Sequence, residues 1–182
     1  MAVSGKHRLV CLDKDGTLLV DEPFNVDPER IRPTPGAAEA VQMLGRAGFR
    51  LAVVTNQPGV AQGRFAASEL EGVRAWLDRF FAAADVTLSG FYVCPHAGGC
   101  DCRKPAPGLL RRAMDELGAD PGSSWMIGDI LDDVEAGSRA GCRTVLLDNG
   151  NETEWLPGVH RRPDFSAPDL AAAARRVLEA RP

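Results

Sequence analysis

The amino-acid sequence contains no long hydrophobic run. No segment of the 182 residues approaches the roughly 18 consecutive apolar residues of a membrane-spanning helix, which argues against such a span and against a membrane partner. The basic residues near the N-terminus are followed only by a strand-length apolar run from Leu9 to Leu12, whereas a secretory signal peptide needs about 7 to 15 apolar residues. We therefore expect no signal peptide and a cytoplasmic location.

The chain also lacks an excess of basic residues and an even number of cysteines. Its 21 lysines and arginines against 25 acidic residues give a net charge of −4, which weighs against a nucleic-acid partner. An anionic ligand would need positive charge concentrated locally, for instance as a metal ion. Five cysteines cannot all be paired in disulfides within the chain.

Internal repeats, low-complexity segments and domain linkers are absent as well. A chain of 182 residues corresponds to one ordinary domain. Hydrophobic residues make up 45% and charged residues 25%, which is typical of a globular protein that builds its core without disulfides. We predict a single domain over residues 1–182, present as a monomer.

Five short apolar segments without polar alternation indicate strands that are covered on both faces, as in a parallel sheet. They span residues 8–12, 50–55, 90–94, 125–128 and 143–147. Amphipathic segments at 36–47, 68–83, 107–117, 130–140 and 168–180 indicate helices, the second with a capping-box-like start at Ser68. This alternation predicts an α/β fold with a doubly wound, mainly parallel sheet. Residues 148–163 read as one long loop.

Chemically capable side chains follow four of the predicted strands. Ligands bind beyond the carboxyl ends of the strands in open α/β sheets, so we expect these side chains to converge there. In chain order they are Asp13, Asp15 and Thr17; Thr55 and Asn56; the segment from Cys94 to Lys104; and Asp129 and Asp133.

Asp13 and Asp15 stand two residues apart, directly after the first strand. Carboxylates so close together repel each other unless a cation lies between them, and Mg²⁺ prefers oxygen ligands and bridges to phosphate. Asp129 can supply a further oxygen, and Asp133, one helical turn later, can support the metal indirectly. The alternative is a pair of solvated turn aspartates. An EF-hand and a Walker A loop are excluded because the residues that they require are missing.

Two further groups could bind a phosphate beside these carboxylates. Thr55 offers a hydroxyl and a backbone N–H, and Lys104 offers a point positive charge. Each alone is weak evidence, because a threonine often simply ends a strand and a lysine is usually solvated. Together with a carboxylate that can attack phosphorus, they support phosphoryl transfer through an aspartyl-phosphate.

Three cysteines and one histidine lie close together in the loop after the third strand. Cys94, His96, Cys100 and Cys102 form a set typical of a closed, tetrahedral, structural Zn²⁺ site. A disulfide is disfavoured in the cytoplasm, and Cys100 and Cys102 stand too close for a relaxed bridge. We predict that this zinc loop, residues 94–104, clamps the segment that delivers Arg103 and Lys104. The remaining cysteines, Cys11 and Cys142, are assigned to the core.

These motifs resemble those of the haloacid dehalogenase (HAD) superfamily of phosphatases. The resemblance rests on Asp-x-Asp-Gly-Thr at 13–17, the strand-ending Thr55, the Lys-Pro pair at 104–105 and Gly-Asp-x-x-x-Asp at 128–133, in the family's order. It implies Asp13 as nucleophile and Asp15 as general acid and then base. It also implies a HAD-like Rossmannoid sheet and a Mg²⁺ ion held by Asp13, the backbone carbonyl of Asp15, and Asp129. Supporting and phosphate-binding roles are expected for Thr17 and Asp133 and for Thr55, Asn56, Arg103 and Lys104.

Segments 54–63 and 102–105 further resemble a zinc-containing branch of the superfamily, whose members act on a heptose bisphosphate or on histidinol phosphate. The resemblance implies Mg²⁺-dependent hydrolysis of a phosphomonoester on a small phosphorylated sugar, with the 7-phosphate of D-glycero-D-manno-heptose 1,7-bisphosphate as the leading expectation. Histidinol phosphate is the alternative substrate. A catalytically silent, zinc-containing interaction module is the alternative from a different class.

The chain departs from many members of the superfamily in having no room for a cap domain. The usual insertion points, residues 18–35 and the zinc loop, are short, and only residues 97–99 separate His96 from Cys100. We therefore expect an open site edged by residues 19–25, residues 57–64 and the zinc loop.

A second departure is Ile130, which follows Asp129 where several relatives carry a basic residue. One positive charge near the phosphate is therefore missing from this position. Arg103, Lys104 or Lys14 could compensate for it.

Overall fold

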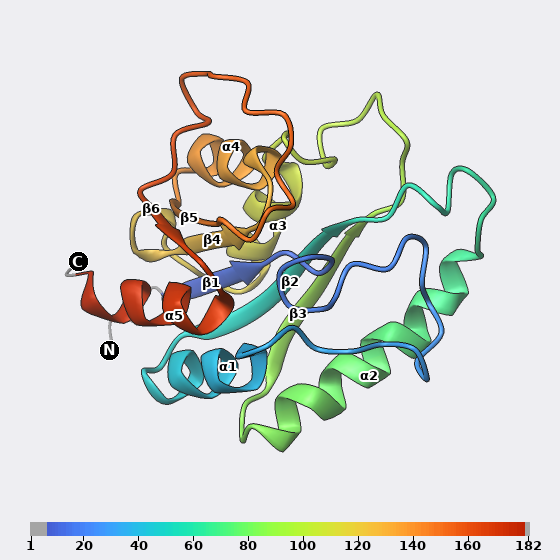
Figure 1. The fold of residues 1–182 in the computed structure, drawn as a ribbon, viewed down its shortest axis with the longest axis horizontal. Helices are drawn as coiled ribbons and strands as arrows, with labels where there is room; N and C mark the ends of the chain where they lie inside the picture. The colour runs from blue at the N-terminus through green and yellow to red at the C-terminus, as the bar shows by residue number, and fades with distance from the viewer. Residues whose placement is uncertain (1–6, 181–182) are drawn as a thin grey trace.

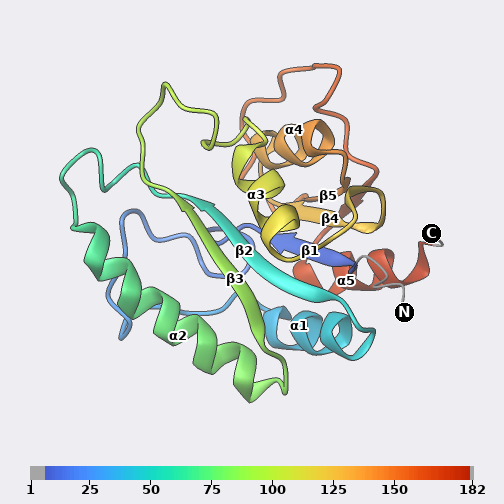
Figure 2. The same ribbon diagram turned by 180° about the vertical axis from the view of Figure 1, so that it is seen from behind.

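A six-stranded sheet lies between two layers of helices in the computed structural model, which describes residues 7–180 (Figure 1, Figure 2). The first six residues, part of the segment considered for a signal peptide, lie outside this range. All neighbouring strands are parallel, in the order β3-β2-β1-β4-β5-β6, which confirms the predicted fold class. The strands are β1 (Leu9–Leu12), β2 (Arg50–Asn56), β3 (Leu88–Cys94), β4 (Trp125–Gly128), β5 (Arg143–Leu147) and β6 (Phe165–Ala167).

The helices are divided between the two faces of the sheet. One face is covered by α1 (Ala37–Arg46), α2 (Leu70–Ala83) and α5 (Leu170–Glu179), the other by α3 (Gly108–Glu116) and α4 (Leu131–Ala140) (Figure 1). Because successive side chains of a strand point to opposite faces, β1 places Val10 and Leu12 in one core and Leu9 and Cys11 in the other. None of the helices within residues 7–180 is both long and apolar enough to cross a membrane.

Neither of the two usual insertion points carries an additional domain. Residues 13–36, between β1 and α1, form isolated bridges but no named strand or helix, and residues 95–107, between β3 and α3, form the zinc loop. Within residues 7–180, therefore, no cap domain is inserted at either point. Long loops follow the carboxyl ends of β1, β2 and β3 (Figure 2).

One local prediction was wrong, and one strand was missed. The helix near residue 68 does not begin with a capping box at Ser68; the backbone N–H of Ala66 donates to the Glu69 carboxylate at 2.7 Å, and residues 67–69 form a 3₁₀ turn before α2. The strand β6 was not predicted. It has only three residues, and a contact distant in sequence supports it, because the Asp164 carboxylate accepts from the backbone N–H of Thr144 at 2.7 Å.

The assignment of two cysteines to the core is confirmed. Cys11 is fully buried in β1, and Cys142 is buried just before β5, with its sulfur 3.5 Å from the Met114 sulfur. Burial raises the pKa of both thiols, that of Cys142 to about 12. They are therefore protonated at neutral pH and pack as small apolar side chains.

Candidate active site

The loops that follow β1, β2, β3 and β4 meet at the carboxyl ends of the strands (Figure 1). They surround a pocket of about 210 Å³. Its lining includes most of the site residues expected from the sequence outside the zinc loop's metal ligands. The lining residues are Asp13, Asp15, Asp21, Thr55, Asn56, Lys104, Asp129, Ile130 and Asp133.

Lys104 is anchored at the floor of this pocket between two carboxylates. Its Nζ lies 2.5 Å from Asp13 Oδ1 and 2.6 Å from Asp133 Oδ1, and it donates to the backbone carbonyl of Val54 at 2.9 Å. Burial by itself would lower the pKa of Lys104, but the charges of Asp13 and Asp133 more than offset this and raise it. The lysine therefore holds a fixed positive charge beside Asp13.

The buried acidic residues of the pocket, Asp13, Asp129 and Asp133, have pKa values raised above that of a free aspartate, mainly by burial. Burial raises the pKa of Asp13 to about 7, against the opposing charge of Lys104, and the carboxylates of Asp133 and Asp15 raise it further. Burial, together with the charge of Asp13, raises the pKa of Asp129 to about 6. A cation placed among these groups would keep them ionised at lower pH.

The oxygens of this cluster fit a magnesium ion. Carboxylate oxygens of Asp13, Asp129 and Asp133 lie within 4.8 Å of one another, and hard oxygen donors are the ligands that Mg²⁺ prefers. Gly16 allows the β1 loop to approach Asp129: its φ is +79°, and a Cβ at this position would lie only 2.1 Å from Asp129 Oδ2. Asp133 is already engaged by Lys104, which agrees with a supporting position.

Asp129 is held by a hydrogen bond to each of its oxygens. Thr17 Oγ1 donates to Asp129 Oδ1 at 3.1 Å, and Asn151 Nδ2 donates to Asp129 Oδ2 at 2.8 Å. Thr17 was expected from the sequence to support the site. Asn151, which lies in the loop after β5, was not.

Asp15 lies at the pocket edge, where its side chain is 30% exposed. It accepts from Lys14 Nζ at 2.5 Å and from Gln57 Nε2 at 2.9 Å. Gln57 Nε2 also lies 2.9 Å from Thr55 Oγ1, so one buried amide links the β1 loop to the end of β2. These contacts hold the Asp15 carboxylate at the edge of the pocket that Asp13 and Lys104 also line.

Two expected phosphate-binding residues make contacts with the zinc loop. The side chain of Asn56 donates to the carbonyl of Lys104 and accepts from its backbone N–H, both at 3.0 Å. Arg103 donates to the carbonyl of His96 at 3.3 Å and does not line the pocket. Asn56 therefore fixes the position of Lys104, while phosphate binding by Asn56 and Arg103 stays a prediction.

The four expected zinc ligands lie together in one cluster. The sulfur of Cys94 is 3.6 Å from that of Cys100 and 3.2 Å from that of Cys102, and the latter two are 3.3 Å apart. His96 Nδ1 lies 3.6 Å from the Cys94 sulfur and 3.3 Å from the Cys102 sulfur. A tetrahedral zinc ion with bond lengths of about 2.0 to 2.3 Å requires ligand separations close to these. The donor set and its spacing therefore fit Zn²⁺.

The pKa values of two thiols in this cluster are shifted in opposite directions. A hydrogen bond from Cys102 is the main cause that lowers the pKa of Cys100 to about 6, while burial and the neighbouring thiols raise the pKa of Cys102 to about 12. A thiolate at Cys100 is the ionisation state in which a thiol binds a metal.

The zinc loop is also attached to the start of α3, because Gly108 N donates to the carbonyl of Asp101 at 2.9 Å.

The expectations from the sequence did not include Gln57 or Asn151 as functional residues. Gln57 directly follows the Thr55-Asn56 pair at the end of β2. Asn151 lies in the loop after β5, and the rule that identified the other four loops applies equally to this fifth strand. Extending that rule to β5 would have pointed to Asn151, and Gln57 already lay within residues 57–64, which were expected to edge the site; the hydrogen-bond partners of neither residue could have been foreseen.

Comparisons with known proteins agree with this geometry. Residues 101–173 match a family model described as HAD-hydrolase-like. The chain is 38% identical to a D-glycero-β-D-manno-heptose-1,7-bisphosphate 7-phosphatase from Pasteurella multocida, across 79% of this chain and 83% of that protein. It is 34% identical to the enzyme of the same name from Pseudomonas aeruginosa, across 94% of this chain and 98% of that protein.

A solved structure shares both the fold and part of the sequence. The D,D-heptose 1,7-bisphosphate phosphatase from B. bronchiseptica, crystallised with magnesium and phosphate, superposes with a TM-score of 0.80. It is 30% identical, and the match covers 94% of this chain and 98% of that one. The motifs, the fold and these relatives agree, and the chain therefore belongs to the HAD family of phosphatases, which are phosphoric monoester hydrolases, in the branch of the heptose bisphosphate phosphatases.

Proposed function

We propose that this protein removes the 7-phosphate of D-glycero-D-manno-heptose 1,7-bisphosphate in a magnesium-dependent reaction. The observation that carries the proposal is the buried contact of Lys104 with Asp13 beside Asp129, at the carboxyl ends of the strands. The relatives that cover most of the chain are enzymes named for this substrate, which supports the choice of sugar.

Asp13 is the proposed nucleophile. Its carboxylate oxygen forms a bond to phosphorus while the bond from phosphorus to the sugar oxygen breaks, and Asp15 gives its proton to the leaving oxygen. Lys104 stabilises the charge on the transferring phosphoryl group from a fixed position. Attack thus produces an aspartyl-phosphate and the dephosphorylated sugar.

Asp15, now ionised, serves as the general base for the second half of the reaction. It takes a proton from a water molecule whose oxygen attacks the phosphorus of the aspartyl-phosphate. The bond between Asp13 and phosphorus breaks, which releases inorganic phosphate and regenerates both carboxyl groups. Gln57, which contacts Asp15 and Thr55, holds the acid–base residue in place through both halves.

The two metal ions have separate proposed roles. Asp13, the backbone carbonyl of Asp15, and Asp129 would hold Mg²⁺, which supplies positive charge that neutralises and orients the phosphate. Cys94, His96, Cys100 and Cys102 would hold Zn²⁺, which stabilises the loop that carries Lys104. Thr55, Asn56 and Arg103 are the proposed further contacts of the phosphate.

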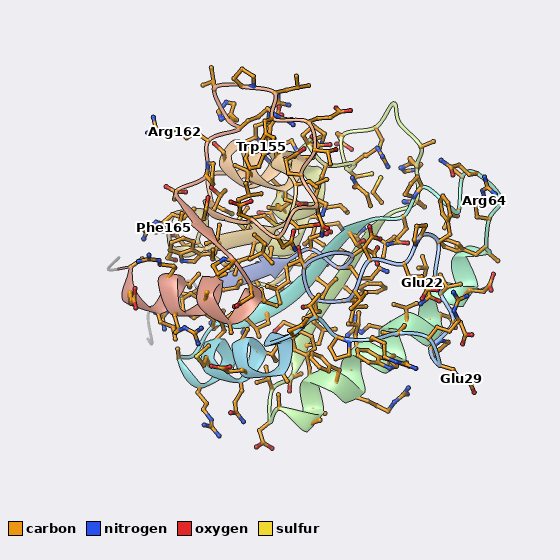
Figure 3. All side chains as sticks on the ribbon, in the orientation of Figure 1. Glu22, Glu29, Arg64, Trp155, Arg162 and Phe165 are labelled. Atoms are coloured by element: carbon orange, nitrogen blue, oxygen red, sulfur yellow. The ribbon has the colours of Figure 1, made fainter. Side chains whose placement is uncertain are left out.

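The absence of a cap suits a polar substrate that reaches an open pocket. Residues 19–25 and 57–64 are the proposed border of the opening. The two segments touch each other, because the Arg64 guanidinium lies over the Phe24 ring, 5.2 Å from its centroid, and both side chains are exposed (Figure 3 labels Arg64). Lys14 and Lys104 supply positive charge at the site, where Ile130 supplies none.

We infer that residues 1–182 act as one domain and as a monomer. Reduced thiols at the zinc loop favour the cytoplasm as its location.

A hydrolysis panel tests the substrate proposal. Phosphate release would be measured for both anomers of the heptose bisphosphate and for histidinol phosphate, with Mg²⁺ and zinc-loaded protein. We expect kcat/KM for one heptose anomer to exceed that for histidinol phosphate by at least about 100-fold. The opposite ranking would replace the sugar with histidinol phosphate as the substrate.

A further inference from the structure

The loop after β5 reaches back to the metal-binding cluster. Figure 1 shows the segment between β5 and β6 running along α4, and its first residues, 148–152, lie beside the site. We name these five residues the β5 strap. They belong to none of the motifs that the proposed reaction uses.

The β5 strap is attached at three points, to the loop after β1, to Asp129 and to the first residue of α4. Asn149 Nδ2 donates to the carbonyl of Gly16 at 2.9 Å, Asn151 Nδ2 donates to Asp129 Oδ2 at 2.8 Å, and Glu152 Oε2 accepts from Leu131 N at 2.6 Å. Within the strap, Asn151 N donates to Asn149 Oδ1 at 3.2 Å. The position of the Asn151 amide is therefore determined by contacts on both sides of it.

The Asn151 amide is chemically suited to orient a residue that binds a metal. Asn151 and Thr17 each donate one hydrogen bond to a different oxygen of Asp129, which restricts rotation of the carboxylate. Each oxygen keeps a further lone pair that can bind a cation. An amide donor is uncharged, whereas a lysine or arginine at this position would compete electrostatically with a cation. Asn151 can thus orient Asp129 without lowering its affinity for a metal.

The fold also makes space for this contact. A Cβ at Gly16 would lie 2.1 Å from Asp129 Oδ2 and 2.6 Å from Asn151 Nδ2. Only a glycine at residue 16 lets the asparagine and the aspartate meet without displacement. Asn151 itself is exposed to solvent and is not part of either core, so the loss of its side chain should not unfold the protein.

We propose that Asn151 is a positioning residue that holds Asp129 in the orientation that binds Mg²⁺, so that the β5 strap sets the metal affinity of the site. This inference rests on the magnesium site of the proposed function but not on the identity of the sugar. Hydrogen bonds to the ligands of a metal typically change its affinity by 10-fold to 100-fold. The effect should appear in metal binding rather than in the chemical step.

The test is the variant Asn151→Ala in the full-length, zinc-loaded protein. Mn²⁺ binding would be followed by the electron paramagnetic resonance of the free ion, and phosphate release would be measured against Mg²⁺ concentration. We expect Mn²⁺ affinity to fall about 10-fold, and the Mg²⁺ concentration for half-maximal activity to rise by the same factor. At saturating Mg²⁺, kcat should stay within about threefold of the wild type.

Arg161→Ala is the matched control. Arg161 fastens a later part of the same loop to α4, through Asp132 at 3.0 Å and Glu135 at 2.7 Å. If the contact with Asp129 is what matters, Arg161→Ala should bind Mn²⁺ as the wild type does. An equal loss of affinity in both variants would assign the effect to loop attachment in general and overturn the proposal.

Asp129→Asn separates this proposal from the one on which it rests. Loss of Mn²⁺ binding in Asp129→Asn with wild-type binding in Asn151→Ala would overturn the role of Asn151 and leave the metal site in place. Equal Mn²⁺ binding by the wild type and Asp129→Asn would overturn the metal site itself. Binding is measured without substrate, so a different substrate would leave the result for Asn151 intact.

Discussion

At the scale of single residues, the site depends on one buried cation among acidic groups. Lys104 is 3% exposed and contacts Asp13 and Asp133 directly. Each partner needs the other, because an unpaired charge in such a buried position is strongly unfavourable. The same contacts that stabilise the fold here also place a positive charge where the phosphate would bind.

Lys104→Met is expected to damage both stability and catalysis. It leaves two neighbouring buried carboxylates without a cation, which should lower the free energy of unfolding by about 3 kcal/mol. It also removes the charge beside the nucleophile, which should lower kcat by about 1,000-fold. Urea unfolding and phosphate release with saturating Mg²⁺ measure the two effects.

Arg103→Met is the comparison for this variant, since it removes the same charge one residue earlier. Arg103 contacts the carbonyl of His96 and does not line the pocket, so we expect at most about a 10-fold loss of kcat/KM, mainly through KM. If Arg103→Met lost kcat as severely as Lys104→Met, the central position assigned to Lys104 would be wrong.

Gln57→Leu should reduce turnover while leaving the fold intact. The substitution keeps a buried side chain of similar size but removes the amide that contacts Asp15 Oδ2 and Thr55 Oγ1, each at 2.9 Å. Misplacement of an acid–base residue lowers kcat by about 10-fold to 100-fold. Gln62→Leu, an exposed position in the same loop, is the control and should match the wild type. Unchanged kcat in Gln57→Leu would show that Gln57 does not position Asp15.

Most residues of the candidate site could be predicted from the sequence, because they directly follow strands, at the carboxyl ends where ligands bind in an open α/β sheet. Asp13, Thr55, Lys104 and Asp129 line the pocket as expected, or lie at its floor. The direction in which Arg103 points could not be predicted, because a flexible side chain chooses between a phosphate and a nearby carbonyl. The contact between Asn151 and Asp129 also depends on how a long loop folds back, which no local pattern encodes.

At the scale of elements, the loops carry the function and the sheet only positions them. The pattern of apolar residues predicted the boundaries of five strands and five helices to within a few residues of those in the structure. The strand β6 did not, because three residues with one buried side chain carry almost no pattern and depend on pairing with β5. The zinc loop could be predicted from the sequence, because four metal-binding side chains within nine residues are rarely a coincidence.

Removal of zinc is expected to destabilise the protein before it affects chemistry. A zinc-selective chelator, with Mg²⁺ kept in excess, should lower Tm by about 5 to 10 °C, because the cluster closes the loop between β3 and α3. Cys100→Ser should start from the lower Tm and show little further change with chelator. A chelator that stopped turnover at an unchanged Tm would contradict a structural role for the zinc.

At the scale of the whole molecule, the site is a region of concentrated charge within a mildly acidic protein. The net charge of −4 by itself says little about function, but Asp13, Asp129 and Asp133, which line the pocket, are all buried. Such a cluster lowers the stability of the fold unless protons or a cation neutralise it. Metal binding and folding are therefore coupled.

This coupling predicts how stability depends on pH. Burial raises the pKa of Asp13 to about 7 and that of Asp129 to about 6, so between about pH 4 and pH 7 the folded chain binds more protons than the unfolded chain. Without Mg²⁺, the contribution of these groups to stability should therefore fall as pH rises through this window. Mg²⁺ binds the ionised forms and should stabilise the protein more at high pH.

Urea unfolding with and without excess Mg²⁺ measures this difference. We expect the stabilisation by Mg²⁺ to be larger by about 1 to 2 kcal/mol near pH 7.5 than near pH 5. In Asp129→Asn the stabilisation by Mg²⁺ should be small at both values. An equal effect of Mg²⁺ at both pH values in the wild type would contradict the coupling.

The identity of the phosphate that leaves tests the central claim most directly. The reaction of the zinc-loaded protein with Mg²⁺ and D-glycero-D-manno-heptose 1,7-bisphosphate would be followed by ³¹P nuclear magnetic resonance, beside Asp13→Asn. We predict that the 7-phosphate signal is replaced by inorganic phosphate while the 1-phosphate signal remains, and that Asp13→Asn is slower by about 10⁴-fold or more. Loss of the 1-phosphate first, or equal rates for the wild type and Asp13→Asn, would contradict the account.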